Sequence, residues 1–294
     1  MTPLDRIYVQ IPAYRDTELS KTLLDLYAKA TGPQGLRTGV VWQRARGERL
    51  DAAVRALPNL EILEVPHEAA RGCNWARGVL QDRWRGERYT LLLDSHHRFV
   101  TGWDRLLIGM YETLRAQASE KPLLTAYLPA YDPEREPGGR RKRPYKIYPL
   151  AREHGLLTKL TSYPLPGWQK RQGPAEANFL SLHFIFGAGM FNRDVPADPD
   201  IYFFGDEVAM GLRAYTLGYD LFHPHVVVGW HCFDRASRRS HWADHADWRQ
   251  RHERSLTKLR RLYLGREPEA AQLGGTRTIG DYEDRIMARL VDPR

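Results

Sequence analysis

Short apolar runs alternate with segments of helical periodicity over about the first 130 residues of the chain. Apolar runs of this length are typical of buried strands. Between them, apolar residues recur every three or four positions, as at Leu19, Leu23 and Leu26, which indicates helices. We expect strands at 7–12, 38–43, 60–65, 89–94 and 123–128, and helices at 19–30, 50–57, 74–85 and 103–117. This alternation predicts an α/β fold with a mostly parallel, Rossmann-like sheet flanked by helices.

The chain changes character between residues 131 and 178. This stretch is rich in proline and glycine and contains the basic run Arg140–Arg143. We expect a long, mostly irregular flap, because such loops are usually functional lids or disordered segments. The basic run is either an ordinary solvated cluster or part of a mobile surface that binds a polar or anionic acceptor.

The regular pattern resumes at Asn178 and continues to the end of the chain. We expect a helix at 206–217, strands at 219–222 and 226–230, and a charged helix at 240–264. No linker separates two folding units, so the sequence predicts one domain over 1–294. Its parts are a nucleotide-binding half (1–130), the flap (131–178), an acceptor and catalytic half (179–240) and a helical extension (241–294).

Composition limits the classes of protein that remain. The 44 Lys and Arg residues against 36 Asp and Glu give a net charge of +8. This excess favours nucleic acid, an anionic membrane or phosphorylated small molecules as ligands, or reflects a generally basic surface. The two cysteines, Cys73 and Cys232, form no metal-binding pair motif and predict a reducing cytoplasm. No run of about 18 apolar residues predicts a membrane span, and Met1–Arg6 shows no signal peptide.

In a parallel sheet, ligands bind beyond the carboxyl ends of the strands. This rule places four segments around one crevice: Pro12–Asp16, Gln43, the segment near Arg71, and Asp94–His96. The topology alone therefore predicts a single ligand-binding site at this edge of the sheet.

Asp94-Ser95-His96 follows the apolar strand 89–94 directly. If the strand conformation persists, Asp94 and His96 point to the same side and His97 points away. A carboxylate and an imidazole on one side can supply two ligands of a divalent metal site, although a simple strand-end turn explains the same residues equally well. His231 ends another apolar strand and can supply a third ligand, with His223 and His225 as competitors.

Two further clusters carry candidate chemistry. Asp206 and Glu207 follow Gly205 at the predicted start of a helix, where acids either complement the helix dipole or face a reacting sugar or acceptor hydroxyl. Arg71 and Arg77 flank the start of another helix. They are either solubilising surface residues or ligands of a phosphate, for which arginine is well suited.

Taken in order, these segments resemble a known family of glycosyltransferases, typified by the hydroxyproline N-acetylglucosaminyltransferase that modifies a ubiquitin-ligase adaptor protein. The matching motifs span nearly the whole chain. They are IYVQIPAYRD, GVVWQ, the 71–77 segment, YTLLLDSHHRFVTGWD, VPADPDIYFFGDEVAMGLRAYTLGYDLFHP, WHCFDR and GTRTIGDYE. The chain is also distantly similar to the polypeptide N-acetylgalactosaminyltransferases, which share an Asp-x-His motif after an apolar strand. Both resemblances imply a nucleotide-sugar fold of the GT-A type, a retaining reaction and a divalent metal.

The resemblance also implies roles for individual residues. Asp94, His96 and His231 would bind the metal, Mn²⁺ first and Mg²⁺ second. Asp206 and Glu207 would act on the sugar or the acceptor hydroxyl. The UDP-sugar donor, with N-acetylglucosamine as the implied sugar, would contact the strand-end and arginine positions Pro12, Tyr14, Arg15, Gln43, Arg71, Arg77 and Ser95.

Two other classes of protein compete with this interpretation. An Asp-x-His motif with a distant histidine also suits a metal-dependent hydrolase of a nucleotide or phosphorylated substrate. The net charge and eight tryptophans also fit a non-catalytic nucleic-acid or glycan-binding protein. Because the acids cluster at strand ends, we expect an enzyme with no nucleic-acid partner. The family resemblance implies a hydroxyl-bearing protein or glycan as its acceptor. The sequence leaves the oligomeric state open.

Overall fold

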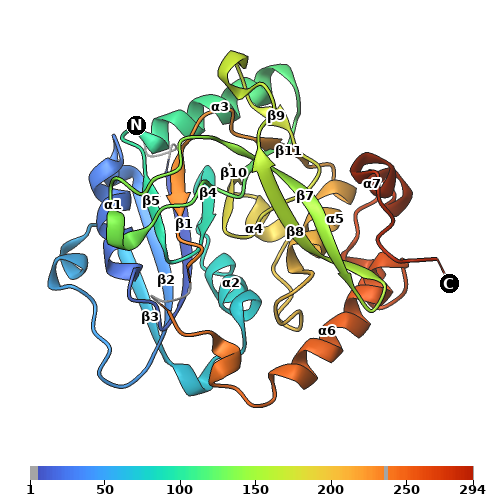
Figure 1. Cartoon of the computed structure of the whole chain (residues 1–294), viewed down its shortest axis with the longest axis horizontal. Helices are drawn as coiled ribbons and strands as arrows, with labels where there is room; N and C mark the ends of the chain where they lie inside the picture. Colours follow the sequence, from blue (N-terminus) through green and yellow to red (C-terminus); the bar gives the residue numbers. More distant parts are fainter. Residues whose placement is uncertain (1–5, 235–237, 294) are drawn as a thin grey trace.

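The computed structural model describes residues 6–234 and 238–293. Its centre is an eight-stranded sheet of strand order β3-β2-β1-β4-β10-β6-β11-β9 (Figure 1). The first four strands are parallel to one another, and β10 runs antiparallel to both its neighbours. The mostly parallel sheet predicted from the sequence is therefore confirmed. The strands of this sheet are β1 (Ile7–Tyr14), β2 (Leu36–Arg44), β3 (Leu60–Pro66), β4 (Tyr89–Leu93), β6 (Pro122–Thr125), β9 (Ala175–Glu176), β10 (Phe184–Ala188) and β11 (Asp220–His223).

The central strands form where the chain is almost continuously apolar. All five residues of β4 are buried, as are the first five of β1; such runs suit strands that are covered on both faces. The polar residue Gln10 fits within β1 because its amide donates hydrogen bonds to Thr90 Oγ1 and Asn192 Oδ1, both at 2.7 Å.

Helices pack on both sides of the sheet (Figure 1). In α1, Leu19, Leu23 and Leu26 are fully buried in the main core, as their helical spacing predicts. A second core lies where α5, α6 and α7 pack together. The helices are α1 (Leu19–Lys29), α2 (Cys73–Gln81), α3 (Trp103–Gln117), α4 (Phe191–Asp194), α5 (Asp206–Thr216), α6 (Trp248–Tyr263) and α7 (Ile279–Ile286).

The order of the strands creates a crevice at the carboxyl ends of β1 and β4. The chain moves from β1 outward through β2 to β3, and then returns to place β4 on the other side of β1. The connections after β1 and β4 therefore leave the sheet in opposite directions, which opens space for a ligand between them. The segments Tyr14–Asp16 and Asp94–His96 border this space.

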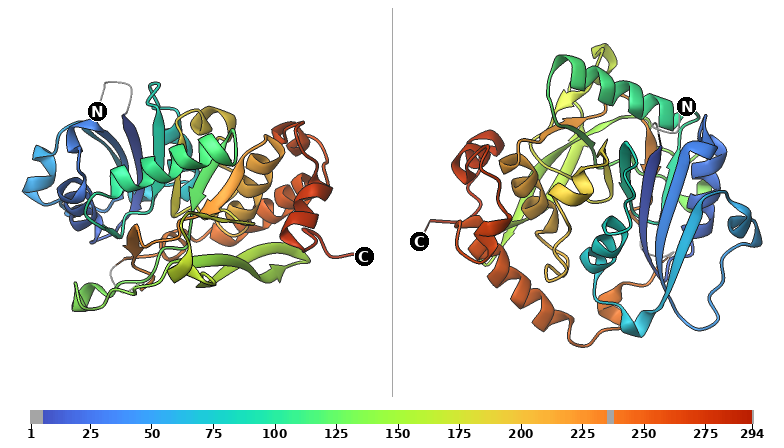
Figure 2. Two further views of the ribbon diagram at one scale, coloured as in Figure 1. Left: turned by 90° about the horizontal axis from the view of Figure 1, so that it is seen from above. Right: turned by 180° about the vertical axis from the view of Figure 1, so that it is seen from behind.

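The segment 131–178 corrects the expectation of a mostly irregular flap. It contains a hairpin of two nine-residue strands, β7 (Tyr145–Glu153) and β8 (Leu156–Pro164), which lies as a layer of its own on one side of the molecule (Figure 2). Its turn is formed by His154 and Gly155, both with positive φ, the backbone that suits tight hairpin turns. The prolines lie at the strand ends and at a bulge after Pro149, where they disrupt little pairing.

Other boundaries also differ from the prediction. The expected helix 50–57 is only a 3-10 turn, Ala52–Ala56, because Pro58 favours extended backbone at Leu57. The expected helix 240–264 begins at Trp248 and is preceded by a short turn, His241–Ala243. The expected strand 226–230 is reduced to β12 (Gly229–His231), which pairs with β5 (His97–Phe99) in a separate two-stranded sheet.

Among the residues that the structure describes, no helix has the length and apolar composition needed to cross a membrane. Two features used in the sequence analysis fall partly outside these residues, namely Met1–Arg6 at the start of the chain and Arg235 at the end of the WHCFDR motif.

Candidate active site

The four predicted segments line one cavity at the carboxyl edge of the sheet. Its wall includes Pro12 and Tyr14 from β1, Gln43 from β2, and Asp94–His96 after β4. Gly72 and Cys73, at the start of α2, complete this side, and residues 238–242 of the C-terminal half cover the other. The cavity has a volume of about 150 Å³. The crevice predicted from topology is therefore present.

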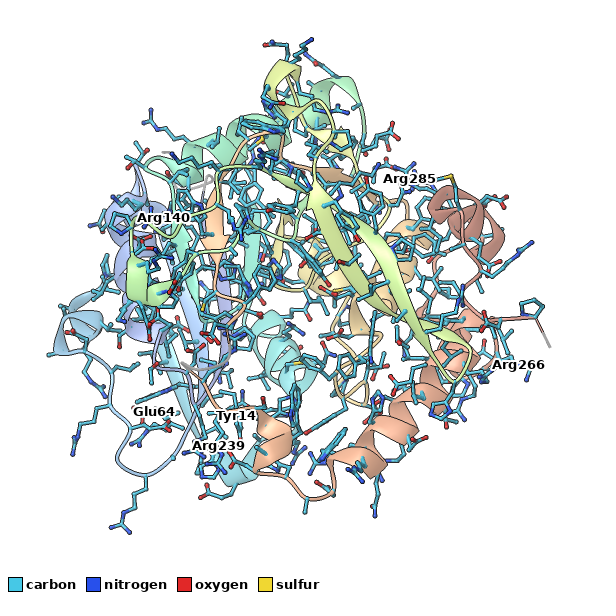
Figure 3. The ribbon with its side chains drawn as sticks, in the orientation of Figure 1. Tyr14, Glu64, Arg140, Arg239, Arg266 and Arg285 are labelled. Atoms are coloured by element: carbon cyan, nitrogen blue, oxygen red, sulfur yellow. The ribbon has the colours of Figure 1, made fainter. Side chains whose placement is uncertain are left out.

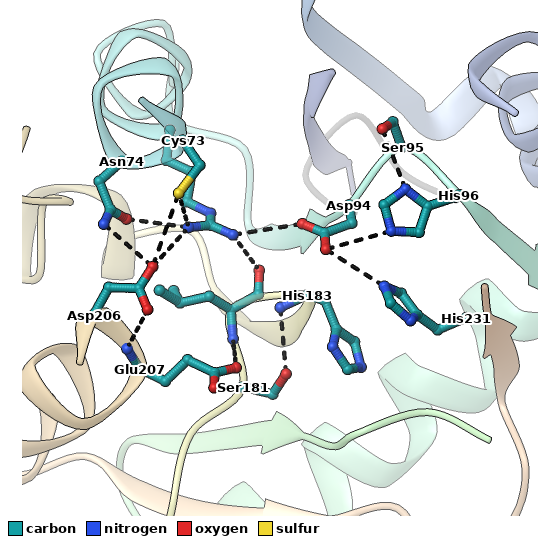
Figure 4. A network of polar contacts seen from close by, with 12 residues as sticks. Cys73, Asn74, Asp94, Ser95, His96, Ser181, His183, Asp206, Glu207 and His231 are labelled. Carbon is teal, nitrogen blue, oxygen red and sulfur yellow. Dashed lines mark hydrogen bonds and ion pairs between the residues drawn. The ribbon is translucent and has the colours of Figure 1, made fainter. Parts of the chain in front are cut away.

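Asp94, His96 and His231 lie together (Figure 4), and Asp94 and His96 also line this cavity. Asp94 Oδ2 is 3.7 Å from His96 Nε2 and 3.4 Å from His231 Nε2, and one ligand atom from each residue lies within 4.8 Å of the others. Two imidazoles and a carboxylate form a donor set that suits Mn²⁺, Zn²⁺ or Fe²⁺.

A two-stranded ribbon, rather than strand alternation, brings these side chains together. β4 ends at Leu93, so the premise that Asp94 and His96 continue the strand is wrong. The chain turns there and enters β5, which pairs with β12 so that His97 lies opposite His231. His97 itself is buried and its Nδ1 donates to the Asp94 carbonyl oxygen at 3.0 Å.

The competing histidines have other roles. His223 is buried in β11, where its Nδ1 donates to the Thr125 carbonyl at 2.7 Å and its Nε2 accepts from the Ile147 amide at 3.3 Å. Both of its ring nitrogens are therefore used in packing the hairpin against the sheet. His225 is not part of the group that surrounds Asp94. The choice among the three histidines, which the sequence left open, falls on His231 by position.

The orientation of His96 fits a metal ligand. Asp16 Oδ2 accepts hydrogen bonds from His96 Nδ1 at 2.7 Å and from the Ser95 hydroxyl at 2.6 Å. His96 Nε2 is buried and has no hydrogen-bond partner among the described residues, so its free nitrogen is directed at Asp94. A carboxylate behind a metal-binding imidazole fixes its tautomer and raises its basicity. Sequence reasoning placed Asp16 in the crevice but gave it no function.

We expect Asp16→Asn to weaken Mn²⁺ binding about 10- to 100-fold, the usual effect of losing a carboxylate behind a metal ligand. The asparagine retains the size of the side chain but not its charge. Equilibrium dialysis of Mn²⁺ measures the effect, with Asp82→Asn as a control on an exposed aspartate. Equal Mn²⁺ affinity in both variants would show that Asp16 does not support the site.

Arg77 connects the group of Asp94, His96 and His231 to the two acids of α5. Its buried guanidinium lies 3.4 Å from Asp94 Oδ1 and 3.3 Å from Asp206 Oδ2 (Figure 4). It also donates to the Leu182 carbonyl at 3.3 Å. Burial raises the pKa of Asp94, but the neighbouring His96 and Arg77 more than offset this and hold that pKa below its usual value. Arg77 thus fixes Asp94 in its charged form.

Asp206 and Glu207 begin α5 and face a second cavity. Gly205, with φ of 90°, provides the left-handed turn before them. Glu207 accepts a hydrogen bond from the Tyr127 hydroxyl and one from the Leu182 amide at 3.0 Å. The second cavity has a volume of about 390 Å³ and shares Asp94, Phe203 and Arg238 with the first. The acids therefore line the second cavity, which adjoins the first at Asp94.

The pKa of Glu207 is higher than that of an ordinary carboxyl group. Burial and, after it, the charge of Asp206 raise the pKa of Glu207 to about 7, although the hydrogen bond from Tyr127 opposes this. Burial also raises the pKa of Asp206. A carboxyl group with a pKa near 7 can hold or release a proton at neutral pH.

This environment makes stability depend on pH. Between the ordinary value of 4.5 and about 7, the folded protein holds the Glu207 proton more tightly than the unfolded chain, so stability falls as pH rises. We expect Glu207→Gln to be about 2 kcal/mol more stable than the natural protein at pH 8 and equally stable near pH 4. Urea denaturation across this range measures the difference, and Glu253→Gln, on an exposed side chain, is the control. A pH-independent difference would contradict the prediction.

Three predicted donor ligands do not line the first cavity, namely Arg15, Arg71 and Arg77, of which Arg77 lines the second cavity. The Arg15 guanidinium turns away from the cavity and pairs with Glu48 at 3.1 Å and Asp244 at 2.9 Å. Arg71 is exposed and lines a separate groove beside Trp75, and the backbone turns directly after it at Gly72, where φ is 113°. Pro12, Tyr14, Gln43 and Ser95 do line the first cavity.

Three residues at the site escaped the sequence analysis. His183 is stacked on His231, with ring centroids 4.2 Å apart, and its Nε2 accepts from the Leu128 amide at 3.0 Å. Tyr127 holds Glu207. Asp244 accepts a hydrogen bond from the Tyr14 hydroxyl at 2.8 Å and so ties the C-terminal half to β1. No local motif marks these residues, because each acts across more than 50 residues of chain.

The fold is shared with solved glycosyltransferase structures of the GT-A type. GalNAc-T7, solved with UDP, GalNAc and Mn²⁺, matches with a TM-score of 0.61 at 12% identity over 98% of this chain and 55% of its own. Residues 1–349 of TarS from S. aureus match with a TM-score of 0.52 as the UDP complex (11% identity, 90% of this chain, 77% of that one). The UDP-GlcNAc complex gives the same TM-score (12% identity, 91% and 69%). The chain thus spans about half the length of GalNAc-T7.

The sequence itself identifies the family. A family model described as "Glycosyltransferase (GlcNAc)" matches residues 6–57 and 49–289, which is most of the chain. The chain belongs to this family of glycosyltransferases. No curated protein matches it.

Proposed function

We propose that this protein transfers a sugar, N-acetylglucosamine first among the candidates, from a UDP-sugar to a hydroxyl acceptor. The observation that carries the proposal is the pairing of two sites through Arg77: the group Asp94, His96 and His231 on one side and Asp206 with Glu207 on the other. The family supports sugar transfer. GalNAc-T7 was solved with UDP and Mn²⁺, and TarS with UDP-GlcNAc, which supports this donor class.

Asp94, His96 and His231 would hold the divalent cation, with Mn²⁺ preferred and Mg²⁺ second. When bound, such a cation neutralises charge on the leaving diphosphate. Asp16 holds His96 with Nε2 free, and Arg77 holds Asp94 charged, so the donor set is formed before the ligand arrives. This preorganisation lowers the cost of binding at the moment of reaction.

The first cavity would receive the nucleotide. Pro12 provides an apolar surface and Tyr14 an aromatic ring, whereas Gln43 and Ser95 provide polar groups. The sugar would then point past Asp94 into the second cavity, toward Asp206 and Glu207. This division assigns the donor mainly to residues 1–130 and the acceptor mainly to residues 179–240, within one domain.

Glu207 would orient the sugar or the acceptor hydroxyl. In a retaining front-face reaction the leaving phosphate oxygen can take the acceptor proton, so no protein base is required. The hydrogen bond from Tyr127 and the one from the Leu182 amide fix the direction of the Glu207 carboxyl group. The proposal extends to a hydroxyproline hydroxyl on a protein as the acceptor that the family resemblance implies.

A screen of UDP-sugars with Mn²⁺ or with EDTA tests the proposal. The screen uses UDP-GlcNAc, UDP-GalNAc, UDP-glucose and UDP-galactose, and UDP release is the readout. We expect release from UDP-GlcNAc that stops in EDTA. Metal-independent release would contradict the metal assignment, and cleavage of UDP itself to UMP and phosphate would indicate a hydrolase.

A further inference from the structure

A ring-lined cavity opens next to the second cavity of the active site. Aromatic side chains form its whole lining, and its volume is about 230 Å³. Phe203 and Phe204 line both this cavity and the second cavity, so the two adjoin. Apolar concave surfaces of this kind favour an apolar side chain over water. The six lining residues are Tyr202, Phe203, Phe204, Trp242, Trp248 and His252.

A basic groove continues from the ring-lined cavity along α6. Tyr202 lines both of them. Four cations at helical spacing line the groove from α6, namely Arg251, Arg254, Lys258 and Arg261. Arg71, just before α2, lines the same groove. On a helix this row of cations extends for about 15 Å. The active site, the ring-lined cavity and the groove therefore lie in sequence along one face.

Most of these cations already have carboxylate partners. Arg251 pairs with Asp247 at 2.8 Å, Lys258 with Asp198 at 2.8 Å, and Arg261 with Glu269 at 2.7 Å. Arg71 and Arg254, in contrast, make no ion pair within residues 6–234 and 238–293, and Arg71 lies over the Trp75 ring at 5.9 Å. Two cations of the groove are thus available to an incoming anion.

This charge pattern distinguishes between kinds of anionic ligand. A nucleic-acid backbone carries closely spaced phosphates along its length and would meet Asp200, Asp247 and Glu269, which also line the groove. A ligand with one or two discrete carboxylates avoids these acids. Arginine suits carboxylates well because its guanidinium can donate two parallel hydrogen bonds. The groove therefore favours an acidic polypeptide segment.

We propose that this face binds the flank of a polypeptide acceptor. The acceptor hydroxyl lies in the second cavity, a neighbouring apolar side chain enters the ring-lined cavity, and one or two carboxylates further along pair with Arg71 and Arg254. The inference rests on the proposed function, since it needs an acceptor at Glu207. It assigns Arg71, which does not reach the donor cavity, to acceptor selection.

Synthetic peptides test this assignment. The probes are fluorescein-labelled dodecapeptides with a central serine, threonine or hydroxyproline, a leucine or tryptophan beside it, and two aspartates beyond, made in both chain directions. Matched peptides replace the aspartates with asparagine or with lysine. Fluorescence anisotropy measures binding in the presence of UDP and Mn²⁺. We expect the natural protein to bind at least one aspartate peptide about tenfold more tightly than its asparagine counterpart.

Charge reversal gives the sharper comparison. Arg254→Glu should lose the preference for aspartate and gain one for the lysine peptide, whereas Arg266→Glu should behave like the natural protein. Arg266 is an exposed arginine just beyond the end of α6 and does not line the groove (Figure 3). Trp248→Ala should weaken binding of leucine and tryptophan peptides but not of peptides with alanine at that position. A gain in affinity for lysine peptides excludes misfolding as the reason why Arg254→Glu loses its preference for aspartate peptides.

Several results would overturn the inference. The first is equal binding of aspartate and asparagine peptides. The second is that Arg254→Glu and Arg266→Glu change peptide binding equally. The third is that a dT12 oligonucleotide binds more tightly than any peptide and that Arg254→Glu weakens its binding. UDP release from the UDP-sugar without peptide, measured on each variant, separates the two proposals. If the protein releases UDP from a UDP-sugar but the peptides do not bind as expected, only the acceptor assignment is refuted. If it releases UDP from none of the UDP-sugars, the proposed function is refuted.

Discussion

Asp94→Ala and His96→Ala are each expected to reduce Mn²⁺-dependent UDP-sugar turnover by about a thousandfold or more. Each change removes one of the three groups that surround the proposed cation, and a cation at a leaving diphosphate contributes several kcal/mol to transition-state stabilisation. UDP release at saturating donor measures the loss. His225→Ala, a histidine outside the group around Asp94, is the matched control and should retain activity.

The fold should survive these changes. Arg77 keeps Asp206 as a partner when Asp94 is removed, and Asp94→Asn provides a version that preserves the shape of the side chain. Circular dichroism and the melting temperature check this. Normal turnover in both Asp94→Ala and His96→Ala would refute the metal assignment.

Glu207→Gln is expected to lose transfer by a factor of about a hundred or more while UDP still binds. The glutamine retains the size of the side chain and can still accept from the Leu182 amide, but it lacks the charge that would orient a sugar or hydroxyl group. Titration of UDP in the presence of Mn²⁺ and a transfer assay on the same sample separate binding from reaction. Glu253→Gln serves as the control.

Two other results would change the role assigned to Glu207. Loss of UDP binding in Glu207→Gln would move the residue into the donor site, although Glu207 lines the second cavity and not the first. Unchanged transfer would leave Glu207 with a purely structural role next to Tyr127.

The sequence predicts the sheet well because its signals are local. Apolar runs such as 89–94 and the helical spacing in α1 depend on neighbouring residues only, and both are confirmed. The sequence does not predict the hairpin β7–β8, because a high content of proline and glycine usually indicates irregular backbone. In the fold, Gly155 forms the turn and Pro149 lies at a bulge, positions where these residues assist a hairpin.

The sequence predicts those residues of the candidate site that lie at the ends of strands. Asp94–His96, Gln43 and Pro12 were placed at one crevice by topology, and they line one cavity. The selection of His231 over His223 depends on the pairing of β5 with β12, a long-range contact that no local pattern reveals. Arg71 lines a separate groove and not this cavity, and the chain makes a positive-φ turn at Gly72 directly after it.

Binding of UDP with and without Mn²⁺ tests the central claim most directly. A ligand that binds only the folded state raises the melting temperature. We expect UDP to raise the melting temperature in Mn²⁺ and to have little effect in EDTA. The double variant Asp94→Ala/His231→Ala should show no Mn²⁺-dependent rise. An equal rise with and without Mn²⁺, or a Mn²⁺-dependent rise that persists in the double variant, would contradict the assignment of Asp94, His96 and His231 as the metal site.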